Sequence, residues 1–182
     1  MTIEPNHIIN YWYSEKMRKH WFASTKSIDD DIRKNYLSIW KMAANGELNH
    51  WKSSPDGCLA LAIILDQLPL NMFRNLAKSF ETEQLAVEIT KHAISMHFDE
   101  KIEKDKLAFL YLPLMHSENM DDQDLSLVMF EKSGLTENAR FAEHHRSIIK
   151  AYGRFPHRNS VLGRTSTEEE IDYLNSDQAF KG

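Results

Sequence analysis

The chain has 182 residues, of which 42% are apolar and 27% charged, and its net charge is −5. These values are typical of a globular protein and exclude an intrinsically disordered chain. A chain of this length buries roughly 70% of the surface that its unfolded form exposes, so we expect a single domain with a sizeable core. The acidic balance and the lack of a groove-reading motif make nucleic acid an unexpected partner.

One cysteine, Cys58, lies within an apolar run, which excludes a disulfide within the chain and indicates a buried, unreactive thiol. The first twenty residues lack the basic start and apolar core of a signal peptide. The longest apolar run, residues 58–65, is far too short to cross a bilayer. We therefore expect a cytoplasmic protein that does not enter a membrane.

The first periodic stretch, residues 27–46, predicts an amphipathic helix that carries acids in its first turn and ends just before Gly46. Its apolar stripe consists of Ile32, Tyr36, Ile39, Trp40 and Ala43. Residues 54–69 predict a buried helix, with Ser54 as N-cap, Pro55 in the first turn and Pro69 as the stop. A buried strand is the alternative for the same apolar run.

Five later stretches also predict helices: residues 82–98, 105–118 with a break near Pro113, 121–134, 137–153 and 166–174. In the last of them, Thr167 and Glu170 have the spacing of a capping box. The apolar faces of two of these helices are expected to contain Leu85, Ile89, Ala93 and Met96, and Phe141, His145, Ile148, Ile149 and Tyr152. No convincing hairpin remains, so the sequence predicts an all-α fold.

The tripeptide Leu-Pro-Leu occurs at residues 68–70 and again at residues 112–114. Each copy ends an apolar helix and is followed by a polar cluster and another helix. A repeat of helix pairs would produce this echo, and such repeats stack into arrays. The aromatic residues near the start of the chain are expected to belong to the core. They are Tyr11, Trp12, Tyr13, Trp21 and Phe22.

Positive charge gathers in one irregular stretch, AYGRFPHRNSVLGR at residues 151–164, although the chain as a whole is acidic. Between residues 140 and 164, six arginines or lysines stand against one acid, Glu143. This stretch belongs to the third of three polar clusters that lie at helix ends near prolines. Their members are Asp66, Gln67, Asn71 and Arg74; His116, Ser117, Glu118, Asp122 and Gln123; and His145, Arg146, Arg154, His157, Arg158, Asn159 and Arg164.

Three long segments resemble the signature segments of bacterial domain-of-unknown-function family 924 (DUF924). They are LALAIILDQLPLNMFR, AFLYLPLMHSE and RSIIKAYGRFPHRNSVLGRTSTEEE, and the resemblance covers almost the whole chain. It implies an all-helical, tetratricopeptide-like (TPR-like) array of antiparallel helix pairs, but no activity. The chain departs from the family pattern at Leu68, where Phe is usual, and at Leu70, where Arg is usual.

Two hypotheses of different kinds account for the polar clusters. In the first, the three segments meet around one pocket that binds a small phosphate- or carboxylate-bearing ligand. Twelve residues would bind this ligand: Asp66, Gln67, Asn71, Arg74, His116, Glu118, Arg146, Arg154, His157, Arg158, Asn159 and Arg164. In the second, the clusters are a structural network of arginine–carboxylate pairs in a TPR-like interaction module that binds an acidic peptide.

A catalytic form of the pocket hypothesis is left open. His116 or His157 would act as general base, oriented by Asp66 or Glu118, in a hydrolase or transferase. Ser117 lacks the nucleophile-elbow motif, so nothing in the sequence names a nucleophile. The histidine spacing does not suit a metal site, and His145 is expected to be a packed core histidine. We expect no metal and no cofactor.

Overall fold

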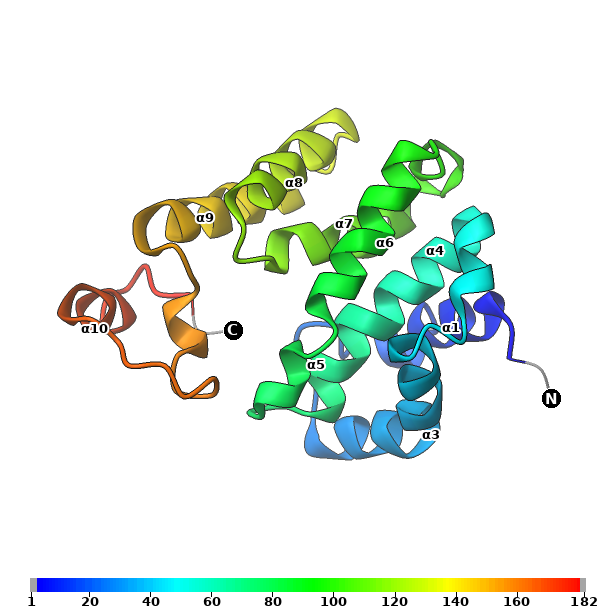
Figure 1. Cartoon of the computed structure of the whole chain (residues 1–182), viewed down its shortest axis with the longest axis horizontal. Helices are drawn as coiled ribbons and strands as arrows, with labels where there is room; N and C mark the ends of the chain where they lie inside the picture. The colour runs from blue at the N-terminus through cyan, green and yellow to red at the C-terminus, as the bar shows by residue number, and fades with distance from the viewer. Residues whose placement is uncertain (1–2, 181–182) are drawn as a thin grey trace. The chain divides into compact units, whose positions relative to one another are not determined.

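The computed structural model describes residues 3–180, and every regular element in this range is a helix (Figure 1). The prediction of an all-α fold is therefore confirmed. The chain divides into two compact units. The first unit comprises residues 3–74 and 78–113, and the second comprises residues 75–77 and 114–180. The single domain and the TPR-like arrangement stay predictions.

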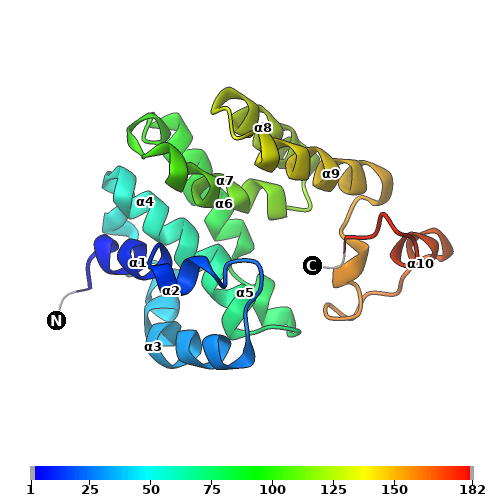
Figure 2. The ribbon, with the colours of Figure 1, turned by 180° about the vertical axis from the view of Figure 1, so that it is seen from behind.

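The first unit is built around helix α4, which packs against both α1 and α6, while α3 packs against α5 (Figures 1 and 2). Its helices are α1 (Pro5–Trp12), α2 (Glu15–Arg18), α3 (Lys26–Ala44), α4 (Pro55–Ala62), α5 (Leu68–Met72) and α6 (Glu83–Ser95). Shorter helical turns are η1 (Asn49–Ser53), η2 (Ile63–Gln67), η3 (Ala77–Phe80) and η4 (Asp99–Lys101). Helix α7 (Lys104–His116) begins in the first unit and ends in the second.

The second unit contains a hairpin of two antiparallel helices, α8 (Met120–Lys132) and α9 (Thr136–Tyr152) (Figure 2). Gly134 links them in a left-handed conformation with φ of 64°, which favours glycine. The turn η5 (Pro156–Arg158) and helix α10 (Glu168–Leu174) follow. A small apolar core formed by Ile148, Ile149 and Phe155 packs against Met120, Tyr152, Tyr173 and Phe180.

Two predicted helix starts are confirmed. The Ser54 hydroxyl caps α4 by accepting a hydrogen bond from the Gly57 N–H, with Pro55 in the first turn. Thr167 and Glu170 form the predicted reciprocal capping box at the start of α10. Cys58 is buried, and burial raises the pKa of its thiol to about 11, which agrees with an unreactive cysteine.

The expected stop at Pro69 is wrong. Helical backbone runs without interruption from Pro55 to Met72, because a π-helical turn, η2, joins α4 to α5. Pro69 has no N–H to offer the carbonyl of Leu65, four residues earlier. The hydroxyl of Thr82 donates to that carbonyl at 2.6 Å and also accepts a hydrogen bond from Trp40 Nε1 at 3.0 Å. A side chain from another segment therefore satisfies the helix at its proline.

The expected break near Pro113 is also wrong. Helix α7 contains Pro113 and continues to His116. The hydroxyl of Thr90, in α6, donates to the Leu110 carbonyl one turn before the proline, at 2.7 Å. Both Leu-Pro-Leu segments thus lie inside helices. The Thr82 hydroxyl bonds the carbonyl four residues before Pro69, whereas the Thr90 hydroxyl bonds a carbonyl three residues before Pro113.

Four residues expected in the core are exposed. Phe22 is 84% exposed, although Trp12, beside the same loop, is fully buried. Leu85, Met96 and Phe141 also lie at the surface, whereas Ile89, Ala93, Ile148 and Ile149 on the same two faces are buried. The buried stripes are therefore narrower than the sequence pattern indicates. Among the residues that the structure describes, no helix combines the length and apolar character needed to span a bilayer.

Candidate functional site

The first polar cluster lies in the first unit, in and just after the π-helical turn η2. Asp66, Gln67 and Asn71 are all buried. Gln67 Nε2 donates to Asp66 Oδ2, and Asn71 Nδ2 donates to the Gln67 carbonyl at 3.1 Å. A π-helical turn widens the helix locally and is frequent at functional sites. Here it directs adjacent polar side chains into a protein interior, where each finds an acceptor or donor.

Arg74, the basic member of the first cluster, pairs with a carboxylate from α3. Its Nε donates to Asp29 Oδ2 at 2.7 Å and its Nη2 to Asp29 Oδ1 at 3.2 Å. The same Nη2 lies 3.3 Å from Asn71 Oδ1. This bidentate geometry is the strongest form of an arginine–carboxylate contact. The sequence indicates Arg74 as a polar-cluster residue but not Asp29 as its partner, because nothing in the spacing links two residues 45 positions apart.

The second cluster joins the end of α7 to the start of α8. Gln123 is fully buried, and its Nε2 donates to the carbonyls of Met115 and Ser117, both at 2.7 Å. The Ser117 hydroxyl donates to Asp122 Oδ2 at 2.7 Å. The two hydrogen bonds from Gln123 satisfy backbone carbonyls at the end of α7 that have no partner within the helix. Asp122 and Gln123 therefore help to fix the junction between α7 and α8 within the second unit.

Glu118 and Arg164 form the centre of the second unit's polar cluster. Arg164 Nη1 donates to Glu118 Oε2 at 2.6 Å, and Nη2 donates to Oε1 at 2.9 Å. The Phe155 N–H also donates to Glu118 Oε1, at 2.8 Å. Burial alone would raise the pKa of Glu118, but these hydrogen bonds and the arginine charges together hold it below its ordinary value. Glu118 is therefore a stable anion that already has its counter-ion.

Arg154 makes the other bidentate pair of the second unit, with Glu170. Its Nε and Nη2 donate to the two carboxylate oxygens at 2.6 and 2.8 Å. Asn159 Nδ2 and the Thr167 N–H both donate to Glu170 Oε2, at 3.1 and 2.8 Å. The hydrogen bonds from Arg154 are the largest cause that lowers the pKa of Glu170 to about 2, against the opposing effect of burial. The capping box indicated the backbone contact of Glu170, but no sequence signal indicated its arginine.

Asn159 connects the two ion pairs. Its Nδ2 contacts Glu170 as described above, and its Oδ1 accepts a hydrogen bond from Arg164 Nε at 3.0 Å. Arg164 Nη2 also donates to the Phe155 carbonyl at 3.2 Å. The buried amide of Asn159 therefore bridges both guanidinium–carboxylate pairs, and the loop after α9 is fixed at several points.

Arg158 is buried beside an aromatic ring and at the end of a helix. Its guanidinium lies 4.6 Å from the centroid of the Phe155 ring, and Nη2 donates to the His116 carbonyl at 2.8 Å. This carbonyl belongs to the last turn of α7, where a cation is favourable. This contact involves the backbone carbonyl of His116. The predicted role of His116 as a ligand-binding residue or general base concerns its side chain.

Two histidines beside this cluster are neutral at pH 7. Burial lowers the pKa of His145 to about 3, and burial together with the charge of Arg158 lowers the pKa of His157 to about 4. His145 Nδ1 lies 2.8 Å from the Phe141 carbonyl, so this nitrogen carries the proton and donates. The prediction of a packed core histidine at position 145 is confirmed.

The second and third clusters meet within the second unit, whereas Asp66, Gln67, Asn71 and Arg74 belong to the first unit. Arg146 stands apart from the other arginines of the third cluster, because its Nε donates to Asp124 on α8. The single pocket for all twelve residues stays a prediction. Among the described residues, no group of three or more His, Cys, Asp or Glu side chains is arranged to hold a metal ion.

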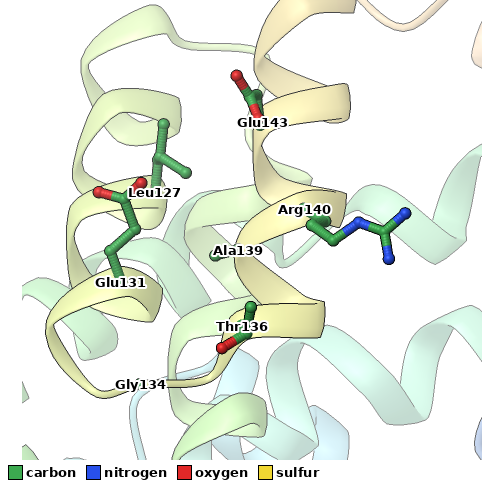
Figure 3. Close-up of a pocket in the computed structure, with 7 residues that line it drawn as sticks. All are labelled: Leu127, Glu131, Gly134, Thr136, Ala139, Arg140 and Glu143. Carbon is green, nitrogen blue, oxygen red and sulfur yellow. The ribbon is translucent and has the colours of Figure 1, made fainter.

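A hollow of about 300 Å³ lies between α8 and α9 near the Gly134 turn (Figure 3). It is lined by Leu127, Glu131, Gly134, Thr136, Ala139, Arg140 and Glu143. Figure 3 shows carboxylates of both helices beside it and the Arg140 guanidinium pointing away. Arg140 Nη1 forms an ion pair with Glu137 Oε2 instead, at 3.3 Å. This hollow therefore presents negative charge, and none of the twelve predicted ligand-binding residues lines it.

The described residues thus form an all-helical protein whose second unit contains two bidentate arginine–carboxylate pairs, Arg164–Glu118 and Arg154–Glu170. The chain belongs to the family described as bacterial protein of unknown function, DUF924, whose profile matches residues 8–178. Its fold is similar to the solved structure of a protein of unknown function from Agrobacterium tumefaciens. The two chains are 32% identical with a TM-score of 0.88, over 94% of this chain and 96% of that one. No curated protein matches the chain at a significant level.

Proposed function

We propose that this protein is a helical interaction module and that its arginine–carboxylate clusters are structural. One observation carries the proposal: the guanidinium groups that would bind an anion are already used by acceptors within the same unit. Arg164 donates to Glu118, Asn159 and Phe155, and Arg154 donates to Glu170 and Thr165. A ligand would have to displace these charge-assisted hydrogen bonds, which are among the strongest in proteins.

An interaction module also needs apolar side chains that a partner can cover. The exposed aromatic residues Phe22 and Phe141 offer such anchors, one in each unit. Aromatic residues dominate the binding energy of protein interfaces, and a rigid support lowers the entropy cost of binding. The Phe22 loop is held by the hydrogen bond from Trp21 Nε1 to the Trp12 carbonyl, at 2.9 Å. Phe22 is therefore presented from a fixed position.

The proposal is tested by affinity capture from a bacterial lysate with the wild-type chain and with F22A and F141A variants. We expect one protein to be captured reproducibly and to be lost with at least one of the two variants. The matched control is V128A, which shortens another exposed apolar residue on α8. Capture that is the same for all the chains, or no reproducible capture, would contradict the interaction proposal.

A small anionic ligand is the second candidate, and the partial exposure of two arginines favours it. The side chains of Arg154 and Arg164 are 28% and 23% exposed, so an incoming phosphate or carboxylate can reach their edges. Thermal-shift measurements with phosphorylated and carboxylated metabolites test this candidate. A ligand at 100 times its Kd would add about 2.7 kcal/mol to the unfolding free energy. A raised Tm that R154Q abolishes would favour the ligand over the structural network.

A further inference from the structure

The segment 175–180 folds back onto the second unit and ends with an aromatic side chain between two histidines. The Phe180 ring centroid lies 4.4 Å from that of His145 and 5.1 Å from that of His157. The Phe180 N–H donates to the Tyr173 hydroxyl at 2.9 Å, and the Tyr173 ring packs against Tyr152. We call residues 175–180 the strap. One ring and one hydrogen bond hold its end in place.

The two imidazoles that contact the strap lie in an apolar setting. Both rings also pack against Phe155, at centroid distances of 5.5 and 5.6 Å. His145 is 3% exposed, and its Nδ1–H is taken up by the Phe141 carbonyl. His157 Nδ1 is buried without a hydrogen-bond partner. If either ring took up a second proton, the new N–H would therefore find no hydrogen-bond acceptor in place.

The charged and titratable groups that face these imidazoles are mostly basic. His145 faces His144 on its own helix, His116 at the end of α7 and His157 on η5. The groups that face His157 are Arg158, Arg164, His116 and one carboxylate, Glu118. Glu118 is already held by Arg164 through two hydrogen bonds. A proton on either ring would thus add positive charge to a region where the nearest carboxylate is occupied.

We propose that the strap is a proton-sensitive latch, in which Phe180 stays seated while both imidazoles are neutral and leaves when they take up protons. When Phe180 leaves, water reaches the rings and can solvate the imidazolium charge. The seated form excludes that water, because Phe180 packs on both rings. The latch is a conformational device in the second unit, and it does not depend on the interaction proposal.

Proton linkage gives the direction and the size of the pH effect on the opening of the strap. In the seated form the pKa values of His145 and His157 are about 3 and about 4, whereas solvated imidazoles have the ordinary value of 6.5. Protons therefore bind the open form more strongly, and the seated form loses its advantage as the pH falls below 6.5. Between pH 7 and pH 5 the opening equilibrium should rise by up to about 20-fold for each imidazole that becomes fully solvated.

Hydrogen exchange of the Phe180 amide measures this opening directly, once intrinsic exchange rates are corrected for pH. In the wild-type chain, we expect protection of this amide to fall at least 10-fold from pH 7 to pH 5. The H145N and H157N variants keep an amide donor near the position of Nδ1 but cannot take a proton. Each should reduce the pH dependence, and the double variant should remove it. Protection of the buried amides of α8 should stay constant, which separates opening of the strap from unfolding.

An F180A variant gives a second, independent measurement. It removes the ring, so protection of residue 180 should be low at both pH values, while I171A, at an exposed site on α10, should behave as wild type. The latch is refuted if wild-type protection of residue 180 is the same at pH 7 and pH 5. It is also refuted if the asparagine variants keep the full pH dependence. If the double variant does not fold, the pH dependence of the wild-type chain and the F180A variant still test the latch proposal.

Discussion

Arg164 holds Glu118 through two hydrogen bonds of 2.6 and 2.9 Å, although the two residues lie 46 positions apart in the sequence. Glu118 follows the end of α7, and Arg164 lies in the loop between η5 and α10. The pair therefore ties this loop to the beginning of the second unit. Because the Phe155 N–H donates to the same carboxylate, loss of the charge would also weaken the turn after α9.

We expect E118Q to lower the unfolding free energy by about 2 kcal/mol, because hydrogen bonds to charged groups contribute about 1.5–3 kcal/mol each and the amide can keep part of the contact. Chemical denaturation at pH 7 measures the change. The control is E137Q, which alters an arginine pair with both side chains about three-quarters exposed. Such a surface pair contributes at most about 1 kcal/mol. Equal effects of the two variants would show that the Glu118 pair is not structural.

Glu170 should make stability depend on pH in the acid range. Its pKa is lowered from 4.5 to about 2, so the folded state favours the anion. This stabilisation is present above pH 4.5 and is lost as the pH falls toward 2. We expect E170Q to be less stable than wild type at pH 5, with the difference narrowing at pH 3. The control E168Q, at an exposed position in the same helix, should follow wild type at both pH values. A constant difference between wild type and E170Q would contradict the prediction.

Thr82 should be sensitive to loss of its hydroxyl but not to loss of its methyl group. T82V leaves the Leu65 carbonyl and Trp40 Nε1 without a partner in a buried environment. An unsatisfied buried group costs about 1–3 kcal/mol, so we expect a loss of about 2–4 kcal/mol in unfolding free energy. T82S keeps the hydroxyl and should cost much less. Thermal and urea denaturation of the two variants provide the comparison. Similar losses of unfolding free energy would argue against a structural role for the two hydrogen bonds of the Thr82 hydroxyl.

Gly57 should tolerate no side chain. A Cβ atom at this position would lie 1.9 Å from the carbonyl oxygen of Trp51, which is backbone and cannot turn away. We expect G57A to lower the unfolding free energy by about 3 kcal/mol or more, since strain in a packed region typically costs 1–3 kcal/mol and backbone must move here. G163A is the control, because its Cβ meets open space and its φ of 65° costs roughly 1–2 kcal/mol. A smaller loss for G57A than for G163A would contradict this account.

Much of the secondary structure was predictable because its signals are local. Ser54 and Thr167 cap the helices that they were expected to cap, and Gly46 follows α3 with a φ of 77°. Each of these signals acts within one helical turn, where sequence spacing fixes the distance between the groups. Prolines were misleading, because the carbonyl that Pro69 leaves without its helical partner is satisfied by Thr82, and the helix that contains Pro113 continues to His116. A hydroxyl on another segment leaves no mark near the proline in the sequence.

The sequence indicated the polar residues of the clusters but not how they pair. The sequence indicated that the basic loop would face the protein's own carboxylates or a ligand. Within the second unit, Arg164 pairs with Glu118 and Arg154 with Glu170. Glu170 was named only as a helix cap, and Asp29 was not named as the partner of Arg74. The attraction between two charged groups weakens as the distance between them in space increases. Residue spacing along the chain does not set that distance.

By itself, the sequence determined the helical class, the family, the capped helix ends and the buried state of Cys58 and His145. The family follows from the resemblance of three long segments, and the other properties follow from composition, periodicity and contacts within one turn. Only the tertiary structure decided that both Leu-Pro-Leu helices continue through their prolines, that Phe22 and Phe141 are exposed, and which carboxylate holds which arginine. The ion pairs and the hydrogen bond from Thr82 join groups from distant parts of the chain, and only folding brings such groups within hydrogen-bond distance.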